Sequence, residues 1–304
     1  MPRRNDTDRG PAYRPDVIKT FHADTECRLI DFLIASMPEQ SRTAVKQKLA
    51  HNQVMVNGAV TTQFDTPVHP GAVVKVNFTR EFRSFYNRRL KILYEDDDII
   101  VVNKGYGLLS MGTDKIKDGT AYELLRDWVK WQNPANKLFI VHRLDRDTSG
   151  LMMFAKTEEA KEAMQYNWKN MVRERKYVAL VDGRPDPEEG SYRSYLAENS
   201  RYEVYSTKNP EEGKLAVTRY RTLASGHGYS LVELSLDPGR TNQIGVHMKD
   251  LGCPISGDRR YGGKPSPAHR MCLHAMTLKF IHPVTRKLME FSTPVPISFE
   301  KAMK

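Results

Sequence analysis

The sequence predicts an α+β fold, in which a mixed, largely antiparallel sheet forms the main domain behind a small basic module. After residue 176 the strand-like runs follow one another without regular alternation with helices, which is typical of antiparallel sheets. The length of 304 residues accommodates two domains of about 100–200 residues each. The net charge of +10 is uneven: residues 1–89 hold 14 Lys and Arg against 9 Asp and Glu (+5), and residues 90–304 hold 33 against 28 (+5). The shorter part therefore has more than twice the charge per residue.

The composition indicates a folded, intracellular protein. Hydrophobic residues make up 39% of the chain and charged residues 28%. This composition differs from that of disordered proteins, which have fewer hydrophobic residues and a higher net charge, so we expect the chain to fold. No apolar run approaches the roughly 20 residues of a membrane span, and no apolar segment follows the charged start as it would in a secretory signal. The cysteines, Cys27, Cys253 and Cys272, are odd in number and widely spaced, so we expect reduced thiols and no structural zinc. We therefore expect a cytoplasmic protein with no membrane partner and no bound metal.

The first elements of the chain form a compact unit over residues 16–80, behind a polar, proline-containing segment 1–15 that we expect to be a flexible tail. Apolar residues four apart predict a helix over 26–37. Ser41 is a suitable N-cap for a second helix, which contains Arg42, Lys46 and Lys48.

The rest of this unit is predicted to be extended. The pair Asn57-Gly58 between β-prone runs predicts a hairpin over 54–60, and a further strand is predicted over 73–76. Spacing alone allows Arg42, Lys46 and Lys48 to be either an ordinary solvated face or a surface that binds a polyanion. The basic, aromatic segment 81–90 is predicted to be a linker.

The domain over 91–304 begins with alternating strands and helices and continues with strands. A helix over 241–251 interrupts the later strands and places Ile244, His247 and Met248 on one face. The other predicted elements are strands over 99–103, 138–141, 151–155, 176–182, 190–197, 202–206, 215–224, 228–236 and 271–281, a helix over 121–132, and a helix capped by Thr157.

The segment His142-Arg143-Leu144-Asp145-Arg146-Asp147-Thr148-Ser149-Gly150 is the most informative part of the chain. It is too polar for a core and lies between two apolar strands. By itself it fits equally well a surface loop with exposed ion pairs, which contribute little stability.

Taken with its neighbours, this segment resembles the His-Arg-Leu-Asp-x-x-Thr-Ser-Gly motif of the RluA-type pseudouridine synthases. Four further segments resemble motifs of that family in the same order, and the unit over 16–80 resembles the S4 RNA-binding domain, in which the second helix faces RNA. The segments are Leu93–Lys104, Arg175-Lys176-Tyr177, Gly239–Ile244, and Leu273-His274-Ala275 with Phe280–Pro283. The resemblance implies a catalytic domain of the pseudouridine synthase fold.

The resemblance also implies a reaction and a set of site residues. Asp145 corresponds to the catalytic aspartate, acting either as a nucleophile or as the base that removes a ribose proton. Arg240 corresponds to the arginine that pairs with this aspartate. Tyr177 and Leu273 correspond to the residues on the two faces of the flipped base, and Arg143 to the arginine that takes its place in the RNA.

Cofactors and partners follow from the same reaction. Isomerising uridine to pseudouridine conserves all atoms, so we expect no cofactor, metal or ATP. The S4-like unit favours large-subunit ribosomal RNA over tRNA as the substrate, and we expect a monomer.

Each assignment has an ordinary structural alternative. Tyr177 and Leu273 could belong to the core, Arg240 could bond nearby carbonyls, and Arg143 could pair with Asp147 or another nearby acid. The chain also departs from the family pattern. It has Gly105 where the family usually has proline, Asn242 where it has histidine, and Gly245 where it has arginine.

Two other functions fit parts of the sequence. An aspartyl phosphatase would use Asp145 and Asp147 with Mg²⁺, but it also needs a distal acidic pair, and the segment 257–260 offers one acid. A ribosome-assembly protein that binds ribosomal RNA without modifying it would share every feature of charge and fold. Loss of modification with retained RNA binding in Asp145→Asn distinguishes the enzyme from this protein.

Overall fold

The computed structural model describes residues 16–113, 118–237 and 239–304. The chain divides into two compact units, Met1–Phe85 and Tyr86–Lys304, and the division falls inside the segment predicted as a linker. The tail predicted over residues 1–15 lies outside the described residues. Within the described residues, no helix combines the length and the apolar character needed to cross a membrane.

The first unit packs two helices on small sheets. The helices are α1 (Leu29–Ser36) and α2 (Arg42–Ala50). A four-stranded sheet has the order β1-β6-β3-β4, and a second sheet pairs β2 with β5. The strands are β1 (Ile18–His22), β2 (Cys27–Arg28), β3 (Val54–Val56), β4 (Ala59–Val60), β5 (Pro67–Val68) and β6 (Val73–Asn77).

Local signals in the sequence account for the helices, the β3–β4 hairpin and β6 of this unit, whereas β1, β2 and β5 were not predicted. The Ser41 side chain accepts a hydrogen bond from the Ala44 amide at 3.2 Å and so caps α2 as predicted. Asn57 and Gly58 both have positive φ, 47° and 84°, which is the geometry of a tight hairpin turn. Helix α1 begins three residues later than predicted, because Cys27 and Arg28 pair with β5 instead of joining the helix.

The second unit is built on one eleven-stranded sheet with the path β13-β12-β14-β15-β11-β16-β10-β8-β7, to which β17 adds at β16 and β9 at β10. The strands are β7 (Leu90–Glu95), β8 (Ile99–Lys104), β9 (Phe139–Ile140), β10 (Ser149–Ala155), β11 (Val172–Asp182), β12 (Glu189–Glu198), β13 (Val204–Thr207), β14 (Lys214–Gly226), β15 (Tyr229–Asp237), β16 (Leu273–Ile281) and β17 (Leu288–Ser292). Strands β10 and β16 run parallel, and the other described neighbours run antiparallel. The predicted α+β class with a largely antiparallel sheet is confirmed.

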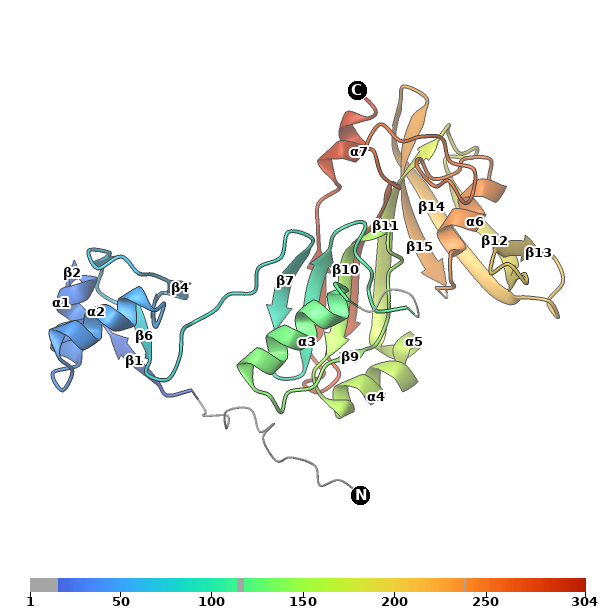
Figure 1. Cartoon of the computed structure of the whole chain (residues 1–304). Helices are drawn as coiled ribbons and strands as arrows, with labels where there is room; N and C mark the ends of the chain where they lie inside the picture. Colours follow the sequence, from blue (N-terminus) through green and yellow to red (C-terminus); the bar gives the residue numbers. More distant parts are fainter. Residues whose placement is uncertain (1–15, 114–117, 238) are drawn as a thin grey trace, which may run out of the picture. The chain divides into compact units, whose positions relative to one another are not determined.

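Five helices accompany this sheet in the described part of the second unit. Figure 1 shows α3, α4 and α5 beside the half that contains β7 and β10, and α6 beside β12 and β13. The helices are α3 (Ala121–Gln132), α4 (Glu158–Tyr166), α5 (Trp168–Met171), α6 (Gln243–Asp250) and α7 (Ile297–Lys301). Helix α3 has the predicted bounds. Helix α6 begins two residues later than predicted, because Asn242 takes a left-handed conformation with φ 52°.

The centre of the sheet fixes the segments that matter for function. All seven residues of β10 are buried, since the strand lies between β8 and β16. The ladder between β11 and β16 pairs Lys176 with Thr277 but Tyr177 with Ala275, so Met276 is an extra residue that forms a bulge. Strands β7 and β17 and helices α5 and α7 were not predicted, because they are short or half-exposed and show no clear period.

Candidate active site

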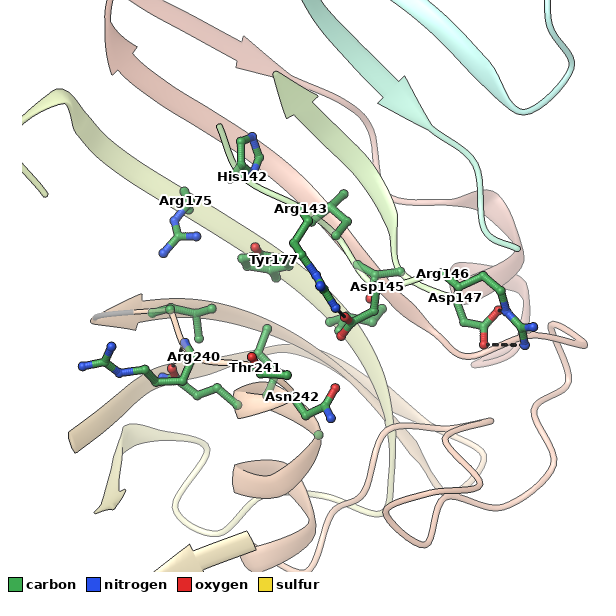
Figure 2. Close-up of a pocket in the computed structure, with 18 of the residues that line it drawn as sticks. His142, Arg143, Asp145, Arg146, Asp147, Arg175, Tyr177, Arg240, Thr241 and Asn242 are labelled. Carbon is green, nitrogen blue, oxygen red and sulfur yellow. Dashed lines mark hydrogen bonds and ion pairs between the residues drawn. The ribbon is translucent and has the colours of Figure 1, made fainter. Parts of the chain in front are cut away.

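The second unit contains a cleft of about 990 Å³ where the sequence-predicted residues meet. The loop 142–148 forms one wall, the turn 239–245 lies opposite, and β11 and β16 contribute Tyr177 and Leu273 (Figure 2). Asp145, Arg143 and Arg240 also line this cleft. Residues that lie up to 130 positions apart, Arg143 and Leu273, are therefore brought together as expected.

Buried polar groups hold the loop that contains Asp145. The Ser110 hydroxyl donates to the Leu144 carbonyl at 2.6 Å and accepts from the Leu144 amide at 3.1 Å. The Gly107 amide donates to the Arg146 carbonyl at 2.8 Å. Because both residues adjacent to Asp145 are bonded to the 107–110 segment, the backbone of the aspartate is fixed.

Lys104 supports the same loop from inside the protein. Its fully buried ammonium donates to the carbonyls of Leu108 at 2.8 Å, and of Gly105 and Arg146 at 3.2 Å each. Burial lowers the pKa of Lys104 to about 8, although the carboxylates of Asp147 and Asp145 oppose this shift.

Gly105 stands where the family usually has proline. The Gly105 amide donates to the Arg89 carbonyl at 2.6 Å, a bond that proline lacks the hydrogen to make. The glycine at this position therefore allows a hydrogen bond that joins the start of the second unit to the end of β8.

Gly150 permits the close approach of the two parallel strands at the base of the loop. Its φ is +116°, and a Cβ at this position would lie 2.2 Å from the Ala275 carbonyl oxygen. A side chain is excluded there. The Ser-Gly end of the motif thus places β10 directly against β16, one residue beyond the His274 position that pairs with Ser149.

Asp145 faces the cleft with a side chain that is 45% exposed. Its Oδ1 lies 4.0 Å from Arg143 Nη2. With the Asn242 amide oriented according to its partners, Asn242 Nδ2 donates to Asp145 Oδ2 at 3.1 Å. Asp145 is therefore open to solvent on this side of the cleft.

The expected ion pair between Arg240 and Asp145 is not present among the described residues. Arg240 Nε donates instead to the Leu215 carbonyl at 3.2 Å, and Figure 2 shows its guanidinium directed away from Asp145. Gln243 fixes the Arg240 backbone, because Gln243 Oε1 accepts from the Arg240 amide at 2.8 Å. Arg240 thus lines the cleft, and its side chain bonds a backbone carbonyl, as in the structural alternative to the ion pair.

Arg143 is the cation beside Asp145. Its side chain is 64% exposed and points toward the aspartate two residues further along the same loop (Figure 2). The alternative partner, Asp147, pairs with Arg146 at 3.2 Å. Arg143 is therefore a largely solvated guanidinium at the edge of the site.

Tyr177 and Leu273 lie on the same face of the sheet. Leu273 pairs with Ala179, two residues beyond Tyr177 on β11, and side chains two apart on a strand share a face. Both are nearly buried, with 8% and 7% of their surface exposed, yet both line the cleft. Burial raises the pKa of the Tyr177 phenol, so it is protonated at neutral pH.

Several cleft residues were not predicted as site residues, although His142 and Arg175 belong to segments that resemble the family's motifs. Arg175 lies two residues before Tyr177, and its guanidinium is 5.5 Å from the ring of Trp168. His142 Nε2 accepts from the Met153 amide at 3.0 Å, and burial lowers its pKa to about 3, so it is neutral. Arg260 and Tyr261 reach the cleft from the turn after α6.

Two further histidines are internal supports. Both nitrogens of His247 bond hydroxyls, Thr218 at 2.7 Å and Ser194 at 3.0 Å, and burial lowers its pKa to about 4. His274 bonds Ser149 at 2.8 Å and Thr293 at 2.9 Å, and burial lowers its pKa to about 4 as well.

The described residues bring one group of possible metal ligands together, Asp96, Asp98 and His282, outside the cleft. His282 Nδ1 accepts from the amides of Val284 and Thr285, so its other nitrogen carries the proton and donates to Asp96 at 2.9 Å. Burial raises the pKa of Asp96, but hydrogen bonds outweigh burial and hold it below its usual range. His282 and Asp96 thus satisfy one another, while the Asp98 carboxylate accepts from the Thr157 hydroxyl at 3.4 Å.

The basic residues predicted to bind RNA in the first unit divide into two kinds. Arg42 and Lys46 are exposed on α2. The Lys48 ammonium lies 4.4 Å from the centre of the Phe78 ring, and burial lowers its pKa. Lys48 therefore packs on its own unit more than it faces solvent.

The cleft contains a carboxylate, a buried phenol, an aliphatic wall and several guanidinium groups. Tyr177 and Leu273 offer an aromatic and an aliphatic surface on which a planar, uncharged ring can pack, while the arginines favour a polyanionic chain to which that ring is attached. The arrangement can therefore bind a nucleotide base and place a carboxylate beside it.

Comparison with known proteins points to the same chemistry. Residues 98–250 match the family model described as RNA pseudouridylate synthase. The chain is 34% identical to the uncharacterized RNA pseudouridine synthase YlyB of Bacillus subtilis, over 88% of this chain and 90% of that protein. It is 33% identical to ribosomal large subunit pseudouridine synthase D of Pasteurella multocida, over 90% and 89%. The solved structure of human RNA pseudouridylate synthase domain containing 1 matches 70% of this chain and 86% of its own, with 27% identity and a TM-score of 0.56.

Proposed function

The chain belongs to the RNA pseudouridylate synthase family, and from that premise we propose that it isomerises uridines of large-subunit ribosomal RNA with Asp145 as the catalytic carboxylate. The single observation that supports this role is the position of Asp145. It lies at the edge of a cleft whose floor is formed by Tyr177 and Leu273, on a loop that Ser110 and Gly107 fix on either side.

The reaction demands little beyond such a cleft. The bond between ribose C1′ and base N1 breaks, the base turns, and C1′ bonds to C5. The proton on C5 leaves and N1 gains one, so atoms and electrons balance without an oxidant or reductant. Asp145 would act either as the nucleophile at the ribose or as the base toward a ribose proton.

The other cleft residues would bind and exchange the base. Tyr177 and Leu273 would sandwich the flipped uracil, since they share one face of the sheet. The Tyr177 phenol, kept protonated by burial, would also be placed to exchange a proton at C5. Arg143 would occupy the space that the base leaves in the RNA, which its exposure at the edge of the cleft allows.

The preference for ribosomal RNA rests on the relatives and on the first unit. The relative from Pasteurella multocida is named for the large ribosomal subunit. We assign the first unit as an S4-like RNA-binding domain, in which the exposed residues Arg42 and Lys46 contact phosphates. A cytoplasmic location and action as a monomer complete the proposal.

Replacing Asp145 with asparagine tests the proposal directly. RNA from cells that lack this gene, labelled with 5-³H-uridine, releases tritium when pseudouridine forms. We expect Asp145→Asn to slow release by about 10²–10⁴-fold or more, the usual contribution of a group that transfers protons or forms a bond. RNA affinity should stay within about twofold, because the side chain is nearly isosteric.

Asp147→Asn is the matched control, since it removes the neighbouring carboxylate, which pairs with Arg146. Its effect on the rate should be much smaller. Tritium release by Asp145→Asn at the wild-type rate would contradict the catalytic role. Release from tRNA but not from the large-subunit fraction would contradict the substrate.

A further inference from the structure

Asn242 directly precedes α6, and its side chain contacts Asp145 in the loop 142–148. Its backbone conformation is uncommon. Its φ of 52° is left-handed, which asparagine tolerates better than most residues. Its Nδ2 donates to Asp145 Oδ2 at 3.1 Å, while its Oδ1 accepts from Arg260 Nη1 at 3.1 Å and from the Tyr261 hydroxyl at 3.2 Å. The amide therefore makes three polar contacts, one of them to the proposed catalytic carboxylate.

The groups behind Asn242 are firmly placed. Tyr261 is 6% exposed, and its ring belongs to the cluster of Leu196, Val204, Ala216 and Val246. The turn that contains it is fixed by the buried Asp258, whose Oδ1 accepts from the amides of Arg260 at 3.1 Å and Tyr261 at 3.3 Å. Arg260 also donates to the Tyr202 carbonyl.

Gly245 provides the room for this arrangement. A Cβ at Gly245 would lie 2.7 Å from Cδ2 of the Tyr261 ring and 3.0 Å from Asp258 Oδ2. Any larger side chain would displace the ring and its hydroxyl. The two departures from the family pattern at the start of α6, Asn242 and Gly245, are thus parts of one local structure that includes Tyr261.

We propose that Asn242 is a positioning residue that orients the carboxylate of Asp145, and that Tyr261 and Arg260 fix Asn242 for this purpose. The inference rests on the proposed role of Asp145. An amide can hold one carboxylate oxygen without adding a counter-charge, and it leaves the other oxygen available to the substrate.

The charges around Asp145 make this role specific to Asn242. Arg143 is 4.0 Å away on a largely exposed side chain, and Arg240 bonds a carbonyl instead. Lys104, Asp258 and the neutral phenol of Tyr177 also interact electrostatically with Asp145. Among the described residues, none of these groups donates a hydrogen bond to the carboxylate, whereas Asn242 does.

Variants can separate orientation of Asp145 from folding. Asn242→Gly removes the amide and suits the left-handed backbone, so it adds no strain. Tyr261→Phe keeps the ring against Gly245 and removes only the hydroxyl. Tyr205→Phe, at an exposed position of β13, removes a hydroxyl that does not line the cleft and is the matched control. Single-turnover tritium release from 5-³H-uridine-labelled RNA, RNA affinity and Tm are measured for each variant.

We expect Asn242→Gly to slow single-turnover release by about 10–100-fold, because misplacing a reacting group by about 1 Å costs up to about 100-fold. Tyr261→Phe should slow it by a smaller factor, about 3–10-fold, as the amide then accepts one hydrogen bond fewer. RNA affinity should stay within about twofold in both variants, and Tyr205→Phe should match the wild type.

A pH profile gives a readout that a merely structural role would not change. Asn242→Asp puts a second carboxylate beside Asp145, which disfavours its ionisation and should move the acid limb of the rate profile to higher pH. Arg143, Lys104, Asp258 and Arg260 are unchanged in this variant, so the shift would report the contact between positions 242 and 145.

The outcomes distinguish this inference from the proposed function. If Asp145→Asn is inactive but Asn242→Gly and Tyr261→Phe match the wild type with an unmoved acid limb in Asn242→Asp, Asn242 does not orient Asp145. A fall in Tm and RNA affinity together, with no change in the pH profile, would also overturn the inference. Full activity of Asp145→Asn would instead overturn the proposed function.

Discussion

In the first unit the basic residues proposed to meet RNA lie on a single helix, α2, whereas in the second unit the cleft residues come from the loop 142–148, from two strands and from the turns on either side of α6. The exposed side chains of α2 need only a capped helix with an apolar face behind them. The cleft needs strand register, a close approach at Gly150 and buried hydrogen bonds to the loop. A binding face can therefore be specified locally, while a catalytic site depends on long-range packing.

The strongest test of this difference between the units is to disturb the contact between the parallel strands β10 and β16 in the second unit. Gly150→Ala would place a Cβ 2.2 Å from the Ala275 carbonyl oxygen at a φ of +116°. We expect the free energy of unfolding of this unit to fall by about 3 kcal/mol or more, from strain and overpacking together. Calorimetry should show a lower Tm for the second unit and an unchanged transition for the first.

Gly228→Ala is the matched control for the backbone term. Gly228 has a φ of +80°, but nothing lies within 4 Å of a Cβ built there. Its replacement should cost only about 1–2 kcal/mol, the usual penalty for a left-handed alanine. Equal decreases in the two variants would mean that the strand contact at Gly150 is not tight.

The effect of acid on stability should also distinguish the two units. His142, His247 and His274 in the second unit have pKa values lowered by burial to about 3, 4 and 4, from an ordinary value of 6.5. Between pH 6.5 and 4 the unfolded chain binds protons that the folded unit does not, so the stability of this unit falls as the pH is lowered through that window. We expect its Tm to drop by several degrees from about pH 7.5 to about pH 5.

His247→Gln sharpens the acid experiment. It removes one titrating group while keeping a side chain that can bond Thr218 and Ser194. The variant should be less stable than the wild type at about pH 7.5 but show a smaller fall in Tm on acidification. If Tm falls equally in both proteins, proton binding to His247 is not part of the acid response.

The smallest expected effect concerns the first unit. Charge-neutralising Arg42 and Lys46 should weaken RNA binding and flatten the dependence of log K on log salt, by about 0.7–0.9 for each phosphate that is no longer bound. Tritium release at saturating RNA should not change, because the cleft lies wholly in the second unit. Lys48→Ala should change the salt slope less, since its ammonium packs over Phe78. An unaltered slope in the double variant would mean that α2 is only solvated.

The sequence predicted best what a few neighbouring residues determine. The Ser41 cap, the Asn57-Gly58 turn and the bounds of α3 were confirmed, because each depends on interactions within one or two turns of chain. Resemblance identified Asp145, Tyr177 and Leu273 as candidates, and the structure places all three in one cleft. Their roles stay predictions.

What the sequence did not show depends on distant partners. Ser110 bonds Leu144 across 34 positions, and no local pattern marks a serine for that contact. The expected pair of Arg240 with Asp145 is not present among the described residues, because Arg240 Nε donates to the Leu215 carbonyl 25 positions away. The link between Gly245 and Tyr261 likewise becomes visible only when α6 and the following turn are packed together.

The bulge at Met276 changes which residues of β16 lie on each face of the sheet. In a regular strand, odd-numbered and even-numbered residues would face opposite sides, so Leu273 and Phe280 would be separated by the sheet. The extra residue reverses the alternation, and Ala275 and Leu278 both fall opposite residues on one side of β11. One face of a single strand therefore supplies the cleft at one end and the hydrophobic core at the other. Deleting Met276 would leave the composition of β16 almost unaltered but would restore the regular alternation of its side chains. Leu273 and Phe280 would then lie on opposite faces of the sheet, so one face of the strand could not supply both the cleft and the core.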